Sequence, residues 1–274
     1  MLSKAQIERF GADGFLIVAD VFTPAEIEGF RSAVDIAVER RGTKPPPIAE
    51  RDAYDRMFTQ YFNLWEDAPE VRPFTFEPKV ARIASMLLHG ARLRIYCDQA
   101  FYKEPGSSET GAHQDYPLLS IAETATVNAW IPLAGCTLEG GALGYLKGSH
   151  RFGAVSRTAF ALGGDPRLND AFEPPAYYAL TPGSVAFHHV LTFHLSLPNR
   201  SALTRKAFAI TYVADGSTRG SHWPHASVDR AGIAVGEKIE GPATPIVWPP
   251  PSEAVRVPPP LANAPRGWPG HRDA

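Results

Sequence analysis

The sequence lacks the marks of several large protein classes. Its two cysteines, Cys97 and Cys136, form neither a disulfide framework nor a CxxC metal site. The net charge of −2 provides no basic field, so we expect no nucleic-acid partner and no binding to an anionic membrane surface. No apolar run near Met1 resembles a signal peptide and no window is long enough to span a bilayer, so we expect a cytoplasmic protein.

Two kinds of catalytic motif are missing as well. The chain contains no glycine-rich phosphate loop of the GxGxxG or GxxxxGK type. It also contains no HExxH motif, in which two histidines hold zinc and the glutamate serves as general base. The second absence argues against a zinc hydrolase.

Helix signals dominate the first third of the chain. Ser3 and Gln6 form a capping box, and Thr23 offers an N-cap directly before Pro24. The expected elements are a helix ending near Asp13, a strand at Phe15–Ala19, a helix from Pro24 to about Arg40, and a helix at Pro78–Leu88 that stops at Gly90.

The character of the chain changes at Arg92. Short apolar or alternating runs follow, separated by turns rich in glycine and proline, and this pattern predicts an all-β sandwich or jelly roll. The expected strands are Leu93–Phe101, Thr124–Pro132, Gly183–Val190 and Phe208–Val213.

We expect one domain over residues 1–240, with a helical part at 1–91 and a β core at 92–215. A tail at 241–274 holds ten of the 26 prolines, so we expect neither helix nor strand there. It either runs extended over the β core, with Trp248 and Trp268 as docking points, or is disordered.

The segment Gly111–Asp115 contains a candidate metal-binding pair. On an extended strand, His113 and Asp115 point to the same face and Gln114 points away. A second histidine from a distant strand would complete the two-histidine, one-carboxylate set of non-haem iron(II) oxygenases. Alone, the pair is weak, because a surface turn with a capping aspartate has the same sequence.

Three histidines compete to be the third ligand. We favour His194 over His188 and His189, although alternation turns one of that neighbouring pair inward. Arg205, eleven residues after His194, would share the barrel interior, where a buried guanidinium needs an anionic partner. The far carboxylate of 2-oxoglutarate fits that need. We expect His150 in a turn, with a hydrogen-bonding role, and His222 and His225 in solvated loops.

Taken together, these residues resemble the phytanoyl-CoA dioxygenase family of iron(II)- and 2-oxoglutarate-dependent oxygenases. The resemblance covers about residues 92–215 and depends on six segments in one order. They are Asp98–Gly106, His113–Asp115, Asn128–Leu133, Glu139–Leu143, Lys147–His150, and His194–Ser201 with Arg205.

The resemblance implies a double-stranded β-helix, a cupin-like jelly-roll barrel, preceded by helices. It implies that His113, Asp115 and His194 hold the iron and that Arg205 anchors 2-oxoglutarate with help from the Ser196 hydroxyl. It also implies that Gln99 and Trp130 line the cosubstrate pocket, although Trp130 equally suits a position in the hydrophobic core.

The implied reaction uses 2-oxoglutarate and O₂, releases succinate and CO₂, and oxidises an unactivated C–H bond. Related halogenating enzymes lack the carboxylate ligand, so Asp115 favours hydroxylation or a related oxidation. The alternative is a metal-binding jelly roll of cupin type without oxygenase activity, an isomerase or binding protein. Arg205 with Ser196 argues against it, because such a protein needs no dicarboxylate anchor.

The substrate is only weakly marked, and the oligomeric state not at all. Four aromatic residues of segment 56–65 fall where the family often builds a substrate lid: Phe58, Tyr61, Phe62 and Trp65. Together with Tyr116 they favour a small, partly apolar molecule, and no basic cluster suggests binding of coenzyme A phosphates. The alternative is that these aromatics pack the helices on the barrel.

Overall fold

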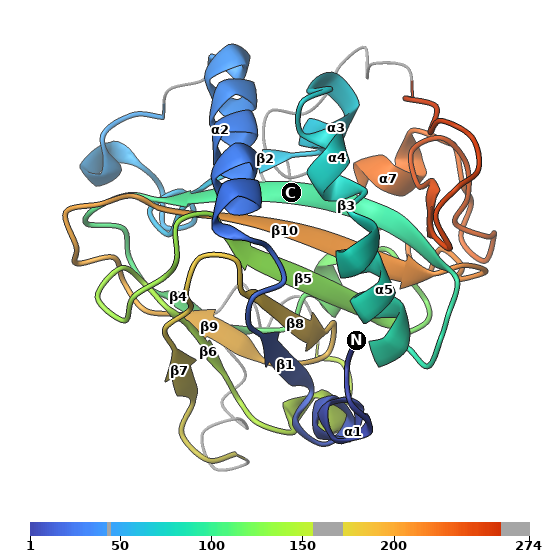
Figure 1. The fold of residues 1–274 in the computed structure, drawn as a ribbon, viewed down its shortest axis with the longest axis horizontal. Helices are drawn as coiled ribbons and strands as arrows, with labels where there is room; N and C mark the ends of the chain where they lie inside the picture. Colours follow the sequence, from blue (N-terminus) through green and yellow to red (C-terminus); the bar gives the residue numbers. More distant parts are fainter. Residues whose placement is uncertain (43–44, 156–171, 259–274) are drawn as a thin grey trace.

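Two antiparallel sheets form the body of the protein in a computed structural model, which describes residues 1–42, 45–155 and 172–258 (Figure 1). Among these residues, the larger sheet has seven strands and the smaller has four. The larger sheet runs in the order β1 (Phe15–Val18), β8 (Val185–His189), β5 (Thr126–Pro132), β10 (Arg205–Ala214), β3 (Leu93–Lys103) and β11 (Ile246–Trp248), with β2 (Thr59–Phe62) also paired to β3. The smaller sheet runs β4 (Thr110–His113), β9 (His194–Ser196), β6 (Leu143–Tyr145) and β7 (Ala176–Tyr178).

The predicted helices are confirmed, together with the local signals that start them. Helix α1 (Lys4–Asp13) begins with a complete Ser3–Gln6 capping box. Helix α2 (Pro24–Arg41) begins with another, in which the Thr23 hydroxyl accepts the Glu26 N–H. Helix α5 (Pro78–Leu87) is followed by Gly90, which adopts a left-handed backbone conformation and donates its N–H to the Ser85 carbonyl.

Helices α2 and α5 cover the outer face of the larger sheet (Figure 1). Phe30 of α2 is fully buried, stacks on Phe74 at 4.4 Å between ring centroids, and meets the ring of Phe208 edge-on at 5.0 Å. Burial of such apolar side chains supplies the main stabilisation. The chain's helical part and its sheet therefore share one hydrophobic core.

The inner face of the larger sheet packs against the smaller sheet. Alternation along β10 sends Phe208, Ile210 and Tyr212 to the helices, and Ala207 and Ala209 to the inner face. A second core lies there, in which Phe15 stacks on Tyr145 of the smaller sheet at 4.3 Å. These two facing sheets are the predicted jelly roll.

Short elements complete the described fold. They are α3 (Leu64–Asp67), α4 (Arg72–Thr75), α7 (Ala226–Asp229) and the 3₁₀ helices η1 (Ile48–Glu50), η2 (Tyr116–Leu118) and η3 (Ser149–Phe152). No helix in the described ranges is long and apolar enough to cross a membrane.

The prediction that the tail forms no strand was wrong. Ile246 and Trp248 pair with Arg94 and Leu93, because three residues between prolines suffice to extend the edge of β3. Trp248 packs against the main core, as its expected docking role requires, whereas Trp268 lies outside the described residues.

Candidate metal centre and its pocket

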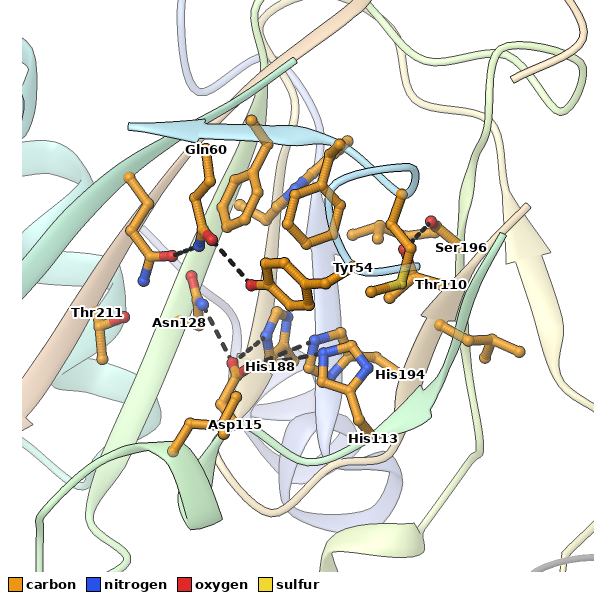
Figure 2. A pocket seen from close by; sticks show the side chains of 18 of the residues that line it. Tyr54, Gln60, Thr110, His113, Asp115, Asn128, His188, His194, Ser196 and Thr211 are labelled. Atoms are coloured by element: carbon orange, nitrogen blue, oxygen red, sulfur yellow. Dashed lines mark hydrogen bonds and ion pairs between the residues drawn. The ribbon is translucent and has the colours of Figure 1, made fainter. Parts of the chain in front are cut away.

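A pocket opens between the two sheets and is lined by side chains from both (Figure 2). Counted out to solvent, the empty space between its walls is about 870 Å³. Every residue predicted from the sequence to bind metal or cosubstrate lies on its wall. They are Gln99, His113, Asp115, Trp130, His194, Ser196 and Arg205.

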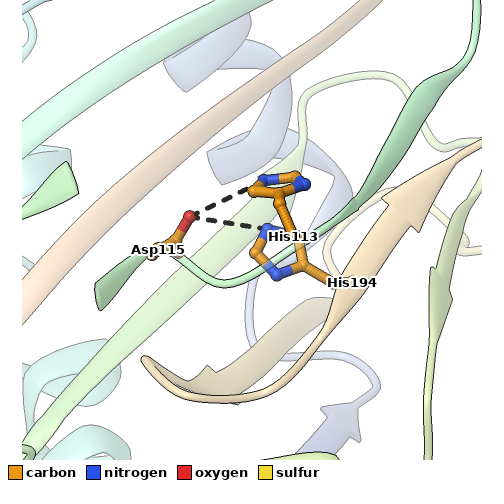
Figure 3. Close-up of side chains that lie close together, drawn as sticks. All are labelled: His113, Asp115 and His194. Carbon is orange, nitrogen blue, oxygen red and sulfur yellow. Dashed lines mark ion pairs between the residues drawn. The ribbon is translucent and has the colours of Figure 1, made fainter. Parts of the chain in front are cut away.

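Three side chains converge at the base of this pocket. His113 ends β4 and stands directly opposite His194 in the paired strand β9. One nitrogen of each ring and one oxygen of Asp115 lie within 4.8 Å of one another (Figure 3). Asp115 reaches this point differently from the expected strand alternation. Its backbone is helical (φ −72°, ψ −32°), because the chain turns into η2 after His113.

Backbone carbonyls determine which nitrogen of each histidine faces inward. The Nδ1 atom of His113 lies 2.9 Å from the Gly111 carbonyl oxygen, and that of His194 lies 3.1 Å from the Thr192 carbonyl oxygen. A carbonyl only accepts, so each Nδ1 carries the proton and donates. Each Nε2 atom therefore carries no proton and can offer its lone pair to a metal.

The electrostatics of this cluster favour a cation. The Nε2 atoms of His113 and His194 lie 3.9 Å and 3.5 Å from Oδ1 of Asp115. Burial lowers the pKa of each histidine to about 4, so both are neutral near pH 7. Burial opposes the ionisation of Asp115, but the neighbouring histidines outweigh it and hold the pKa of this carboxyl far below its usual range. Three acceptors thus face one point, which suits a divalent metal ion.

The two competing histidines lie elsewhere. His188 points into the pocket, but its Nε2 atom contacts the other oxygen of Asp115, Oδ2, at 3.2 Å. His189 faces away, where its Nδ1 accepts the Leu191 N–H and its ring lies 5.6 Å from the ring of His150. Within the described residues, neither belongs to the convergent set, which supports the choice of His194.

Arg205 begins β10 and stands on the inner face of that strand, deep in the pocket wall. It is buried, and its guanidinium lies 5.2 Å from the Trp130 ring centroid. Its Nη1 atom donates a long 3.4 Å hydrogen bond to the Gly141 carbonyl, while Nε has no hydrogen-bond partner in the described structure. No acidic side chain of the described ranges forms an ion pair with it. Burial lowers the pKa of Arg205, and a buried cation of this kind calls for an anionic ligand.

Two hydroxyl groups accompany Arg205. Ser196 lies two residues after His194 on the same face of β9, and its Oγ atom donates to Oγ1 of Thr110 at 3.0 Å. Thr110 was missed from the sequence. Only the register of β4 against β9, which sets Thr110 opposite Ser196, identifies it.

The outer wall is formed by the segment before and within β2. Tyr54, Met57, Phe58 and Gln60 line it, and Figure 2 shows Tyr54 between Gln60 and the histidines. The Tyr54 hydroxyl donates to Oε1 of Gln60 at 2.9 Å, and Nε2 of Gln60 donates to Oε1 of Gln99 at 2.5 Å.

Of the four aromatics of segment 56–65, Phe58 lines the pocket and the other three do not, while a lid role for the segment stays a prediction. The Phe58 ring meets the Phe101 ring edge-on at 5.2 Å. Tyr61 and Phe62 instead pack against hydrophobic cores, and Trp65 is completely buried. Alternation along β2 sends Tyr61 to the main core and Phe62 to a separate hydrophobic cluster.

Three other polar residues have structural contacts. Gln114 points away from the metal cluster, as predicted, and its amide donates to the Leu191 and Gly153 carbonyls. His150 bonds the Gly11 carbonyl at the end of α1. The solvated role expected for His225 was wrong: it is buried at the start of α7, where its Nδ1 accepts the Ser227 N–H and its pKa falls to about 3 through burial.

Comparisons with known proteins agree with this geometry. The family model described as phytanoyl-CoA dioxygenase (PhyH) matches residues 10–207. A protein of Arabidopsis thaliana named phytanoyl-CoA dioxygenase is 29% identical over 256 residues, which cover 77% of this chain and 89% of the relative. A probable alpha-ketoglutarate-dependent hypophosphite dioxygenase of Stutzerimonas stutzeri is 26% identical over 149 residues, covering 48% of this chain and 50% of the relative.

Solved structures share the fold. The non-heme alpha-ketoglutarate-dependent carbocyclase SnoK from nogalamycin biosynthesis superposes with a TM-score of 0.74 at 25% identity, covering 89% of this chain and 96% of that one. The epimerase SnoN, in complex with Fe³⁺, alpha-ketoglutarate and nogalamycin RO, superposes with a TM-score of 0.73 at 18% identity, covering 89% and 98%. At that lower identity the likeness concerns the fold alone.

Proposed function

This chain belongs to the phytanoyl-CoA dioxygenase family of iron- and 2-oxoglutarate-dependent oxygenases, and we propose that it hydroxylates an unactivated C–H bond of a small, partly apolar molecule. One observation carries the proposal. Two imidazole nitrogens and a carboxylate oxygen converge on one point, in the same pocket as a buried arginine that has no acidic partner in the described structure.

The metal would be held by His113, Asp115 and His194. The donor set fits iron(II), because imidazole and carboxylate suit it and a set of three protein ligands would leave room for cosubstrate and O₂. When bound, iron with 2-oxoglutarate and O₂ supplies the oxidising chemistry, with release of succinate and CO₂. The chain's own part is to orient the substrate and to keep bulk water from the reaction.

The far carboxylate of 2-oxoglutarate would pair with Arg205. The unpartnered Nε donor can join an Nη donor in two parallel hydrogen bonds to one carboxylate, which gives both charge and orientation. Ser196 and Thr110 would add hydroxyl contacts, while Trp130 and Gln99 would form the walls. A metal-binding jelly roll without oxygenase activity binds no dicarboxylate cosubstrate, so it would not explain why Arg205 is buried without an acidic partner.

The lining supports the nature of both reaction and substrate. Halogenating relatives lack a carboxylate ligand at the position that Asp115 occupies, so the presence of Asp115 favours hydroxylation. Apart from its histidines, the described part of the lining holds one carboxyl and one basic side chain, Asp115 and Arg205, and both are assigned to metal and cosubstrate. The remaining wall toward solvent is apolar or uncharged, with Tyr54, Phe58 and Phe101 as its aromatic surface. A neutral molecule with an apolar body fits this wall better than the phosphates of an acyl-coenzyme A.

A turnover screen tests the proposal. Iron(II)-loaded protein is incubated with 2-oxoglutarate and O₂, and succinate is measured against a panel of neutral and charged small molecules. We expect neutral, partly apolar compounds to raise succinate release above the substrate-free background, with each hydroxylated product detected by mass spectrometry. Stimulation only by charged thioesters would contradict the substrate class. Absence of any 2-oxoglutarate turnover in metal-loaded protein would contradict the function itself.

A further inference from the structure

Asp115 presents its two carboxylate oxygens to different partners. Its Oδ1 atom faces the Nε2 atoms of His113 and His194. Its Oδ2 atom lies 3.2 Å from Nε2 of His188 and 3.2 Å from Nδ2 of Asn128 (Figure 2). One oxygen is thus free for a metal, while the other is occupied by two contacts from the protein.

The proton of His188 can be assigned from its neighbours. His188 is buried, with 1% of its surface exposed, and its Nδ1 atom lies 3.2 Å from the hydroxyl of Tyr145. The carboxylate oxygen Oδ2 of Asp115 only accepts, so the ring nitrogen that faces it is the one that donates. Nε2 of His188 therefore carries a proton, and in the neutral ring Nδ1 accepts the Tyr145 hydroxyl proton. The result is a directed chain from Tyr145 through His188 to Oδ2 of Asp115.

The two donors come from one rung of the larger sheet. His188 in β8 and Asn128 in β5 are direct partners across the antiparallel pair. Asp115 itself lies after the end of β4, in a turn where its side chain makes no capping hydrogen bond. A turn residue has more freedom than a strand residue, so this rigid rung supplies the constraint that the backbone of Asp115 lacks.

We infer that His188 and Asn128 are positioning residues that make Asp115 a one-oxygen metal ligand, with Tyr145 fixing the tautomer of His188. The inference rests on the proposed function, since it needs a metal at the triad. If Oδ2 were released, both oxygens could bind the metal and fill a position that cosubstrate or O₂ requires. Outer partners of metal ligands contribute in this way in other sites.

Metal binding by matched variants tests the inference without any need for turnover. Cobalt(II), an air-stable substitute for iron(II), is titrated into wild type, His188→Leu, His188→Gln and Tyr145→Phe. We expect about 10- to 100-fold weaker binding for His188→Leu. His188→Gln recovers most of the affinity, because its amide can donate to Oδ2 from nearly the same place. Tyr145→Phe shows a smaller loss.

His189→Leu is the matched control, since it removes the adjacent histidine of the same strand on the opposite face. It is expected to bind cobalt(II) as wild type does. Thermal unfolding of each variant separates the roles: a purely structural His188 would lower the melting temperature of His188→Leu and leave its cobalt affinity unchanged. As a second readout, the anaerobic visible band of iron(II) with 2-oxoglutarate is expected to shift in His188→Leu and to return in His188→Gln.

The outcomes separate the inference from the function. If wild type binds cobalt(II) and folded His188→Leu binds it equally well, the positioning role is wrong while the metal site stands. If His188→Gln is as impaired as His188→Leu, hydrogen-bond donation is not the mechanism, and the inference fails again. If wild type binds no divalent metal, the proposed function fails with it. Asn128→Leu repeats the test should His188→Leu not fold.

Discussion

The inner and outer ends of the pocket are built differently. The inner end takes its groups from paired strands, where register fixes His113 against His194 and Thr110 against Ser196. The outer end depends on segment 54–60, whose side chains at the pocket meet through the aromatic edges of Tyr54, Phe58 and Phe101 and a hydrogen bond from Tyr54 to Gln60. The comparison indicates that paired strands hold the metal and cosubstrate residues of the inner end in fixed positions. The residues of the outer end can differ according to the substrate that the pocket accepts. This division can be tested by changing one end at a time.

The largest effect is expected from Asp115→Ala. Asp115 is the only acidic ligand in the cluster, and its loss removes the negative charge that attracts a divalent cation. We therefore expect no measurable succinate. Metal content after dialysis should fall in parallel. Full activity in this variant would sink the ligand assignment.

Arg205→Lys should damage the inner end more selectively. Lysine keeps the charge but loses the two-donor geometry, and disrupting a buried charged hydrogen-bonded pair costs about 2–5 kcal/mol. The Kd for 2-oxoglutarate is therefore expected to rise about 30-fold or more, with cobalt(II) binding unchanged. Calorimetry with each ligand gives both values. An unaltered Kd for 2-oxoglutarate would show that the cosubstrate carboxylate lies elsewhere.

Phe58→Ala should affect the outer end alone. It removes the ring that contacts both Tyr54 and Phe101, and the loss of about 1.4 kcal/mol corresponds to a KM about tenfold higher for a substrate found by the succinate screen. The Kd values for cobalt(II) and 2-oxoglutarate should stay within about twofold of wild type. Tyr61→Phe, in the same segment but packed against the core, serves as the control. If Phe58→Ala weakened cobalt(II) and 2-oxoglutarate binding as much as it raised the KM for substrate, the two ends would not be independent.

The effect on activity is smallest for a histidine away from both ends, which should change only the stability. The pKa of His225 is about 3 in the fold against 6.5 ordinarily, so between those values the unfolded chain binds a proton that the folded one does not. Acid therefore favours unfolding across that window, by about 2 kcal/mol at pH 5 from this group. His225→Asn retains a helix-capping acceptor but cannot titrate. Its melting temperature should fall less than that of wild type between pH 7 and pH 5, and identical slopes would contradict the assignment.

Local signals in the sequence predicted what local physics decides. The Ser3 and Thr23 caps mark helix starts, because they bond backbone groups only three residues away. The pair His113 and Asp115 was identifiable for a similar reason, since the ligands lie two residues apart. The reason given for their convergence was incomplete, however, because a turn rather than strand alternation brings Asp115 back.

The residues missed by sequence reasoning depend on contacts across the fold. Thr110, Asn128 and Tyr54 enter the pocket through strand register and loop placement, neither of which a periodic pattern encodes. His188 was considered only as a rival ligand. Its contact with the far oxygen of Asp115 depends on how β8 pairs with β5 and how the turn after β4 folds against both. The strand in the tail was missed because its three residues, Ile246–Trp248, become a strand only by pairing with β3.

One anaerobic titration tests the central claim most directly. Iron(II) and then 2-oxoglutarate are added to the protein without O₂, and the visible spectrum is followed. If His113, Asp115 and His194 hold iron while Arg205 holds the cosubstrate, a weak visible band should grow and saturate at about one equivalent of each per chain. Asp115→Ala should give no band. A folded wild-type protein that shows no band with both additions would contradict the account.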